Sequence, residues 1–155
     1  MKKYFLLLLF LPLVLIYACS KNSNGVTNGI KYVPISFQFS VNDPVYSKLG
    51  FSGNWMYLDG YGVKGLILSN VGGVIYALER DCPYNPNDTC ALCTVLTGNT
   101  MISCGRYNTK KVWVPCCNSS FLLDGTLQKG PAVYSMKKYN VTQPDPSTGI
   151  VTITN

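Results

Sequence analysis

The hydrophobic and polar positions of this chain follow two patterns. A continuous apolar block runs from Tyr4 to Ala18, interrupted only by Pro12, and follows two lysines, Lys2 and Lys3. After residue 30, short runs rich in Val, Ile, Tyr, Phe and Thr are separated by Gly, Pro, Asn and Asp, which is typical of strands joined by turns. Strict alternation of apolar and polar residues over Ile35–Val41 predicts a half-buried strand.

The same reasoning predicts further strands and no helix in this part of the chain. The strands are expected at residues 65–68, 74–78, 93–96, 101–104, 112–114, 133–136 and 151–153. Gly98-Asn99 lies between two of these runs and predicts a two-residue hairpin turn. We therefore expect an all-β fold, a small antiparallel sandwich or barrel-like domain.

The N-terminal block has the layout of a secretory signal, because it combines a basic start, a short apolar core and a small residue at its end. It is shorter than the ~20 apolar residues of a membrane-spanning helix, although an uncleaved anchor helix is the alternative. Its end, Ile16-Tyr17-Ala18-Cys19, resembles the bacterial lipobox. This resemblance implies cleavage before Cys19 and lipid attachment to its thiol. We predict a lipoprotein signal peptide at 1–18, a lipidated cysteine with a flexible tether at 19–30, and a β-domain at 31–155.

The composition excludes several function classes. There is no histidine and only one glutamate, Glu79, which excludes Ser-His-Asp and Cys-His catalysis and every histidine-containing metal site. The aspartates are isolated and lie beside turn-forming residues, so we do not expect an enzyme. Removal of the signal lowers the formal charge from +6 to about +4, and the remaining lysines are scattered. We therefore expect no nucleic-acid partner.

Cysteines are the most informative residues of the predicted domain. Six remain after Cys19, and an even number in an exported chain favours disulfides: Cys82, Cys90, Cys93, Cys104, Cys116 and Cys117. Sequence alone leaves their connectivity open. If Gly98-Asn99 forms a two-residue turn, Cys93 and Cys104 lie directly opposite each other on adjacent strands, within reach of a disulfide.

Three segments together resemble a Rieske iron–sulfur domain. They are Val74–Tyr84, Val114–Phe121 and Gly130-Pro131-Ala132, in the order and spacing of the family. Rieske domains hold a [2Fe–2S] cluster with two cysteines and two histidines, from a Cys-x-His loop and a Cys-Pro-x-His-Gly-Ser-x-Phe loop. The resemblance implies a Rieske-like fold for the β-domain.

Three of the four ligand positions depart from that pattern. Cys82 keeps the first cysteine position, Tyr84 replaces the first histidine, Val114 replaces the second cysteine and Cys117 replaces the second histidine. We therefore expect no cofactor and no metal. The alternative is a [2Fe–2S] cluster or zinc held by cysteines alone, with Cys82, Cys90, Cys116 and Cys117 as the candidate ligands.

The resemblance also suggests disulfide pairs. In respiratory-type Rieske proteins a disulfide joins the two cluster-binding loops, which implies a Cys90–Cys116 bridge here. Cys82 and Cys117 would then pair across the vacated cluster site. The Cys90-Ala91-Leu92-Cys93 spacing also suits a thiol–disulfide redox protein, although the surroundings lack the helix N-terminus that lowers a thiol pKa in such proteins.

The sequence therefore predicts an exported envelope lipoprotein whose Rieske-like domain has lost its cluster and has a binding or structural role. The alternatives are an electron-transfer protein that keeps a cluster or metal through cysteines, and a thiol–disulfide redox protein. The expected partners are the membrane, through the lipid, and another envelope protein. Ser20 stands where some lipoproteins carry an inner-membrane retention aspartate, which favours the outer membrane.

Overall fold

The protein is represented by a computed structural model that describes residues 29–98 and 100–155. Cys19 and the predicted signal at 1–18 lie outside the described residues, as do all but the last two residues of the predicted tether. Within the described part the chain forms ten strands in three antiparallel sheets and one short 3-10 helix, η2 (Ser47–Gly50). The expected all-β fold is confirmed.

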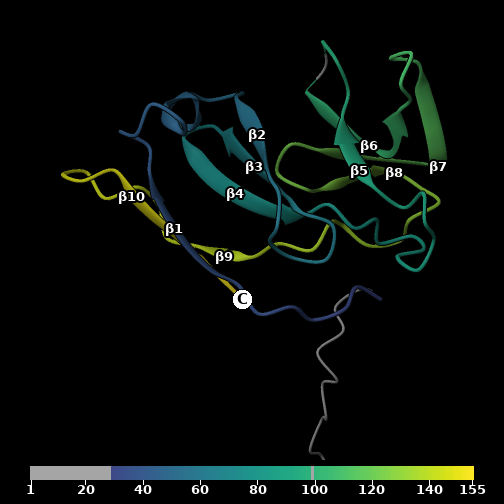
Figure 1. Cartoon of the computed structure of the whole chain (residues 1–155), viewed down its shortest axis with the longest axis horizontal. Coiled ribbons are helices and arrows are strands. Elements are labelled where there is room, and N and C mark those ends of the chain that lie inside the picture. Colours follow the sequence, from purple (N-terminus) through teal and green to yellow (C-terminus); the bar gives the residue numbers. More distant parts are fainter. Residues whose placement is uncertain (1–28, 99) are drawn as a thin grey trace, which may run out of the picture.

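Two three-stranded sheets form the half of the molecule drawn on the left of Figure 1. One has the order β1-β10-β9, with β1 at Ser36–Ser40, β10 at Ile150–Thr154 and β9 at Asn140–Val141. The other has the order β2-β3-β4, with β2 at Trp55–Leu58, β3 at Leu66–Val71 and β4 at Val74–Glu79. We call these two sheets the base.

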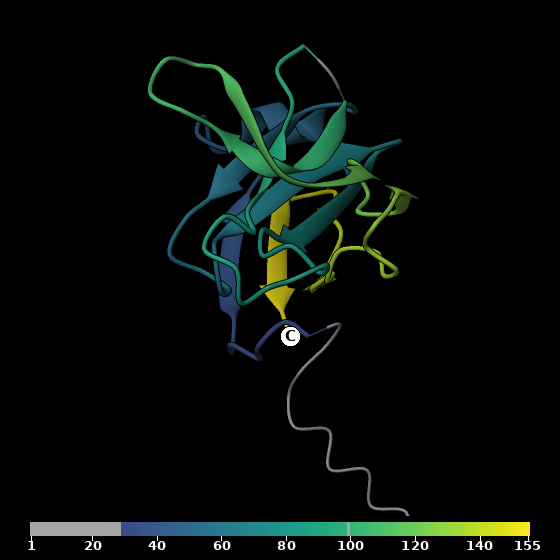
Figure 2. The same cartoon turned by 90° about the vertical axis from the view of Figure 1, so that its right-hand side faces the viewer.

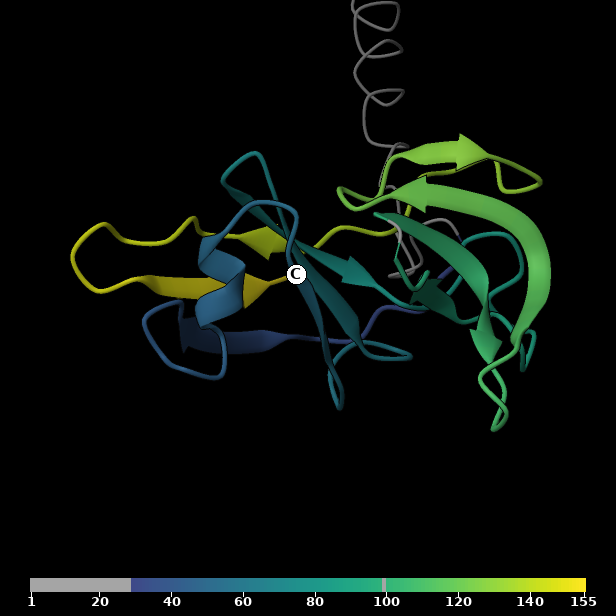
Figure 3. The same cartoon turned by 90° about the horizontal axis from the view of Figure 1, so that it is seen from above.

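The third sheet has four strands in the order β5-β6-β7-β8 and stands beside the base (Figures 1 and 3). Its strands are β5 (Cys93–Val95), β6 (Met101–Tyr107), β7 (Trp113–Leu122) and β8 (Leu127–Lys129). Seen from above, the β2-β3-β4 sheet lies between this third sheet and the β1-β10 pair (Figure 3).

This layering follows from the apolar residues of β3, which cover both faces of the strand. Side chains alternate between the two faces of a strand, so Leu66 and Leu68 face one way and Ile67 the other. Leu66 and Leu68 join a base core with Phe39 and Val151, whereas Ile67 joins a second core with residues of the four-stranded sheet. A strand that is apolar on both faces is buried between two layers.

The four-stranded sheet belongs to a single segment, residues 80–136, which leaves the base after β4 and returns before β9 (Figure 2). The two ends of this segment meet. Leu78 pairs with Lys138 in an isolated antiparallel bridge. The Glu79 amide donates to the Lys137 carbonyl, and the Tyr139 amide donates to the Ala77 carbonyl, each at 2.9 Å. We call residues 80–136 the inserted segment.

Strand prediction from the sequence was correct for most elements and wrong for one. Residues 133–136 form no strand, because Val133 is 77% exposed and the Met136 amide donates to the Gly125 carbonyl in a loop instead of to a neighbouring strand. The pattern missed β2, β8 and β9. Two of these, β8 and β9, are only two or three residues long, too short for alternation to be recognised.

Candidate metal centre

The loop that follows β4 carries Cys82 and is fixed at its start by one buried carboxylate. Glu79, the last residue of β4, is completely buried. Its Oε1 accepts the amide hydrogens of Lys64 (3.0 Å) and Asp81 (3.1 Å). Its Oε2 accepts from the Val63 amide and the Tyr139 hydroxyl, both at 2.8 Å. Four donors on one side chain fix the backbone immediately before Cys82.

A lysine fixes the remainder of the same loop. The ammonium group of Lys64 lies 2.8 Å from the buried Asp81 carboxylate. It also donates to three backbone carbonyls of the loop, those of Pro86 (3.1 Å), Asp88 (3.0 Å) and Ala91 (2.9 Å). Lys64 therefore gathers the loop around one cation, and this leaves little freedom for the residues between Cys82 and Cys93.

A disulfide joins this loop to β7. Cys90 and Cys116 are bonded, with their Cα atoms 5.4 Å apart. The bridge that the Rieske resemblance implied is therefore present. The alternative ligand set of Cys82, Cys90, Cys116 and Cys117 does not fit this arrangement, because the sulfurs of Cys90 and Cys116 are bonded to each other. For the same reason Cys90 does not pair with Cys93 in a redox motif.

Cys93 and Cys104 face each other across β5 and β6, in the register predicted from the sequence. Two hydrogen bonds show which pairs of this ladder are bonded: the Gly105 amide donates to the Leu92 carbonyl, and the Leu96 amide donates to the Met101 carbonyl. Hydrogen-bonded and non-hydrogen-bonded pairs alternate along antiparallel strands, so Cys93 and Cys104, one position from the Leu92–Gly105 pair, form a non-hydrogen-bonded pair. Side chains approach most closely at such pairs, where Cα atoms lie about 4.5 Å apart.

A bulge of four residues in β7 brings Cys117 next to Cys104. Ser103 pairs with Ser120 and Gly105 pairs with Pro115, so four residues of β7, Cys116 to Ser119, stand opposite Cys104 alone. Gly105 permits this close approach, because its φ is +151° and a Cβ there would lie 2.5 Å from the Val114 carbonyl oxygen. Bulges redirect side chains in this way, here toward the core.

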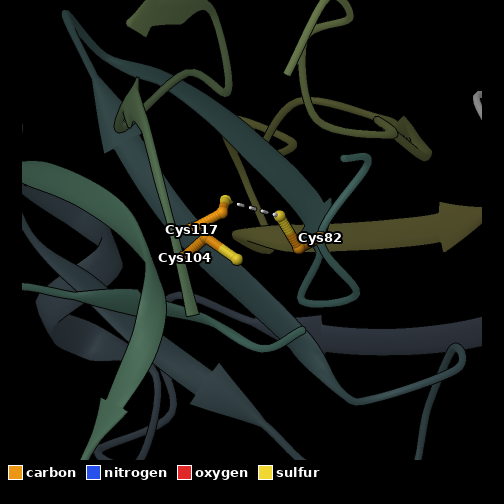
Figure 4. A group of neighbouring side chains, drawn as sticks. All are labelled: Cys82, Cys104 and Cys117. Atoms are coloured by element: carbon orange, nitrogen blue, oxygen red, sulfur yellow. Dashed lines mark hydrogen bonds between the residues drawn. The ribbon is translucent and has the colours of Figure 1, made fainter. Parts of the chain in front are cut away.

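Four unbridged cysteines meet at this point. The sulfurs of Cys82, Cys104 and Cys117 all lie within 4.8 Å of one another, and Cys82 Sγ is 3.9 Å from Cys117 Sγ (Figure 4). Cys93 lies beside this group, opposite Cys104 on the neighbouring strand and buried in the same core. Cys82, Cys93 and Cys104 are buried and Cys117 is half-buried. We call these four residues the sulfur cluster.

The cluster concentrates negative charge on one sulfur. Hydrogen bonds from Cys104 and Cys93 lower the pKa of the Cys82 thiol well below its usual range. The same contacts with Cys82, together with burial, raise the pKa of Cys93 and of Cys104. One thiolate is therefore stabilised by its neighbours, whereas further thiolates in this buried position need a cation beside them.

A buried serine supports Cys117. The Ser119 hydroxyl oxygen accepts the Cys117 S–H at 3.2 Å and the Ala132 amide hydrogen at 2.9 Å. Ala132 belongs to the Gly130-Pro131-Ala132 stretch singled out in the sequence, which the structure thus places against the cluster. Ser119 fixes the rotamer of Cys117 and links β7 to this stretch.

The positions aligned with Rieske ligands do not assemble a Rieske centre. Of the four, Cys82 and Cys117 lie in the cluster. Val114 and Tyr84 are 44% and 52% exposed, and valine has no ligand atom. The residues present therefore do not fit a cluster with two histidine ligands. Instead, Cys93 and Cys104 supply the other two sulfurs. Sequence reasoning placed them opposite each other, but only as a disulfide pair.

Two findings concern the wider identity of the chain. No helix among the described residues is both long and apolar enough to cross a membrane. No protein-family model and no curated protein matches the sequence, so the Rieske resemblance stays a prediction.

Proposed function

We propose that this chain is an exported, lipid-anchored β-domain that carries one thiophilic metal ion on Cys82, Cys93, Cys104 and Cys117. The observation that carries the proposal is the sulfur cluster itself. Four cysteines from a loop and three strands meet unbridged, whereas the two others of the β-domain form a disulfide. The gathered sulfurs favour the metal-carrying alternative over a domain without a cofactor.

The spacing of the sulfurs supports a single ion. A tetrahedral site with metal–sulfur bonds of about 2.3 Å has sulfur–sulfur edges of about 3.8 Å. The Cys82–Cys117 separation is 3.9 Å, and Cys104 lies within 4.8 Å of both. The printed separation matches one edge of such a site, and the third sulfur lies near enough to complete a face of it. Cys93 supplies the fourth sulfur from the strand position opposite Cys104. Four thiolates are the usual donor set for zinc and for a single iron.

The two metals give the domain different roles. Zinc has no redox chemistry, so a zinc-loaded domain is a structural or partner-binding module. Iron bound by four thiolates makes the domain a one-electron carrier. In neither case is the domain an enzyme, since the sulfur cluster is closed by four protein ligands and has no open position for a substrate.

The test is metal analysis of the full chain purified from the envelope of expressing cells. We expect close to one zinc or iron per chain, and substitution by cobalt should give the visible absorption of tetrahedral thiolate coordination. Cys104→Ser should weaken metal binding by at least about 100-fold, more than the loss of an outer-shell contact. The matched control is the double variant Cys90→Ser/Cys116→Ser, which also removes two sulfurs but should keep its metal.

Two results would contradict the proposal. The first is a chain that carries no metal as purified and takes up neither zinc nor iron after reduction. The second is two irons with two acid-labile sulfides per chain, which would mean a dinuclear cluster. Circular dichroism of each variant separates loss of a ligand from loss of the fold.

The lipid anchor is tested separately. Metabolic labelling with a radioactive fatty acid should label the full chain, and Cys19→Ala should abolish the label. A labelled Cys19→Ala chain would contradict the lipid attachment without affecting the metal proposal. Membrane fractionation of the same cells tests the expected outer-membrane location.

A further inference from the structure

The sulfur cluster has a second way of satisfying its four sulfurs, which is to form two disulfides. We propose that oxidation of the metal-loaded cluster joins Cys93 to Cys104 and Cys82 to Cys117, and expels the metal. This inference rests on the proposed function, because it describes how the same site is regulated. The domain then holds its metal under reducing conditions and releases it when oxidised.

The first pair follows from the strand register. Cys93 and Cys104 occupy a non-hydrogen-bonded position of the β5–β6 ladder. The Cα separation of about 4.5 Å at such positions lies inside the range of about 4.4–6.8 Å found for disulfides. Both side chains are buried in the same core. We expect the bond to need little more than side-chain rotation, because the Cα spacing typical of such pairs suits a disulfide.

The second pair follows from the contact that remains. Once Cys93 and Cys104 are joined, Cys82 and Cys117 are left with each other at 3.9 Å. Their sulfurs must approach to about 2.05 Å, a movement of about 2 Å. Cys82 lies in a loop and Cys117 in the β7 bulge, and neither is held in a ladder with the other's segment. Rotation of the two side chains, together with a small movement of the β7 bulge that carries Cys117, can cover this distance.

The existing disulfide supports the pairing of Cys82 with Cys117. Cys90 and Cys116 are already bonded and lie in the two segments that carry Cys82 and Cys117. This bond keeps the loop after β4 and the β7 bulge together when the metal leaves. Cys82 and Cys117 consequently remain neighbours during oxidation.

The electron balance requires two equivalents of a two-electron oxidant, for which we name the disulfide class. Each oxidant molecule accepts two electrons from one pair of thiolates, its own S–S bond breaks, and two protons from solvent complete two product thiols. One protein S–S bond forms in each step. A divalent metal leaves unchanged as the hydrated ion, so two oxidant molecules release one metal.

The experiment uses the full chain loaded with zinc, because zinc cannot supply electrons itself. Oxidised glutathione is added in steps, released zinc is measured with a chromophoric chelator, and disulfides are mapped by mass spectrometry after alkylation. We expect one zinc released per two new disulfides, with Cys93–Cys104 and Cys82–Cys117 as the new pairs and Cys90–Cys116 retained. Reduction followed by addition of zinc should restore the starting form.

Variants separate the two bonds. Cys82→Ser/Cys117→Ser should still form Cys93–Cys104, and Cys93→Ser/Cys104→Ser should still form Cys82–Cys117, each with one equivalent of oxidant. The cross-pairs Cys82–Cys104 and Cys93–Cys117 in the parent would overturn the inference, as would zinc that stays bound at excess oxidant. A chain that never loads zinc fails at the first step and instead contradicts the proposed function, so the two failures are distinguishable.

Discussion

Glu79→Gln tests how strongly one buried carboxylate stabilises the fold around the site. It preserves size and removes the charge on a side chain that is completely buried. Oε1 accepts the amide hydrogens of Lys64 and Asp81, and Oε2 accepts from the Val63 amide and the Tyr139 hydroxyl. A glutamine has one oxygen and one NH₂ group, so its NH₂ must face at least one of these amide donors.

The magnitude follows from these contacts. A hydrogen bond to a charged group contributes about 1.5–3 kcal/mol and a neutral one about 0.5–1.5, so each retained bond weakens by about 1 kcal/mol. At least one buried amide is left without an acceptor, at a cost of about 1–3 kcal/mol. Relief from burying a charge offsets part of this loss. We expect the free energy of unfolding to fall by about 2–4 kcal/mol.

Urea unfolding followed by tryptophan fluorescence measures the effect, with parent and variant both reduced and metal-free. The matched control is Asp145→Asn. Asp145 Oδ1 also accepts four hydrogen bonds, from the amides and hydroxyls of Ser147 and Thr148, but it is exposed to solvent. The control should change stability much less. A Glu79→Gln variant within about 0.5 kcal/mol of the parent would refute the reasoning.

Two further predictions concern the loop that carries Cys82. Compared with the parent in its oxidised form, Cys90→Ser/Cys116→Ser should lower the free energy of unfolding by about 3–4 kcal/mol, because the bridge closes a loop with a sequence separation of 26. An unchanged urea midpoint without reductant would contradict this. Lys64→Met should lower the free energy of unfolding by about 2–4 kcal/mol, because it leaves the buried carboxylate of Asp81 without its cation. This range is below that of a fully buried pair, because the Lys64 side chain is one quarter exposed. It should also speed proteolysis within residues 80–92, whereas Lys48→Met in η2 should not.

The sequence was sufficient to predict where most strands lie and the pairing register of one hairpin. Alternation over Ile35–Val41 correctly located β1, since side chains of a half-buried strand must alternate. The predicted turn at Gly98-Asn99 correctly aligned Cys93 with Cys104, because the length of a hairpin loop sets its register. Local rules of this kind depend only on residues near one another in the chain.

The sulfur cluster was beyond such rules. It depends on a β7 bulge opposite Cys104, and that bulge depends on the close approach of Gly105 to Val114. Neither is visible in the alternation of apolar residues. Two predicted pairs, Cys93 with Cys104 and Cys82 with Cys117, contained all four members, but nothing in the sequence indicated that the pairs lie together. Tertiary packing of two sheets decides this.

The meeting of the two ends of the inserted segment has a consequence for how this architecture can change. Ala77 to Glu79 and Lys137 to Tyr139 run side by side, so residues 80–136 begin and end at one place on the base. A segment with adjacent ends can be exchanged or lengthened while the order and pairing of the host strands are kept. All four cluster sulfurs and the disulfide lie inside it. The base can thus accept a different chemical insert, and the chemistry of this protein can change without any change in the strand order of its base.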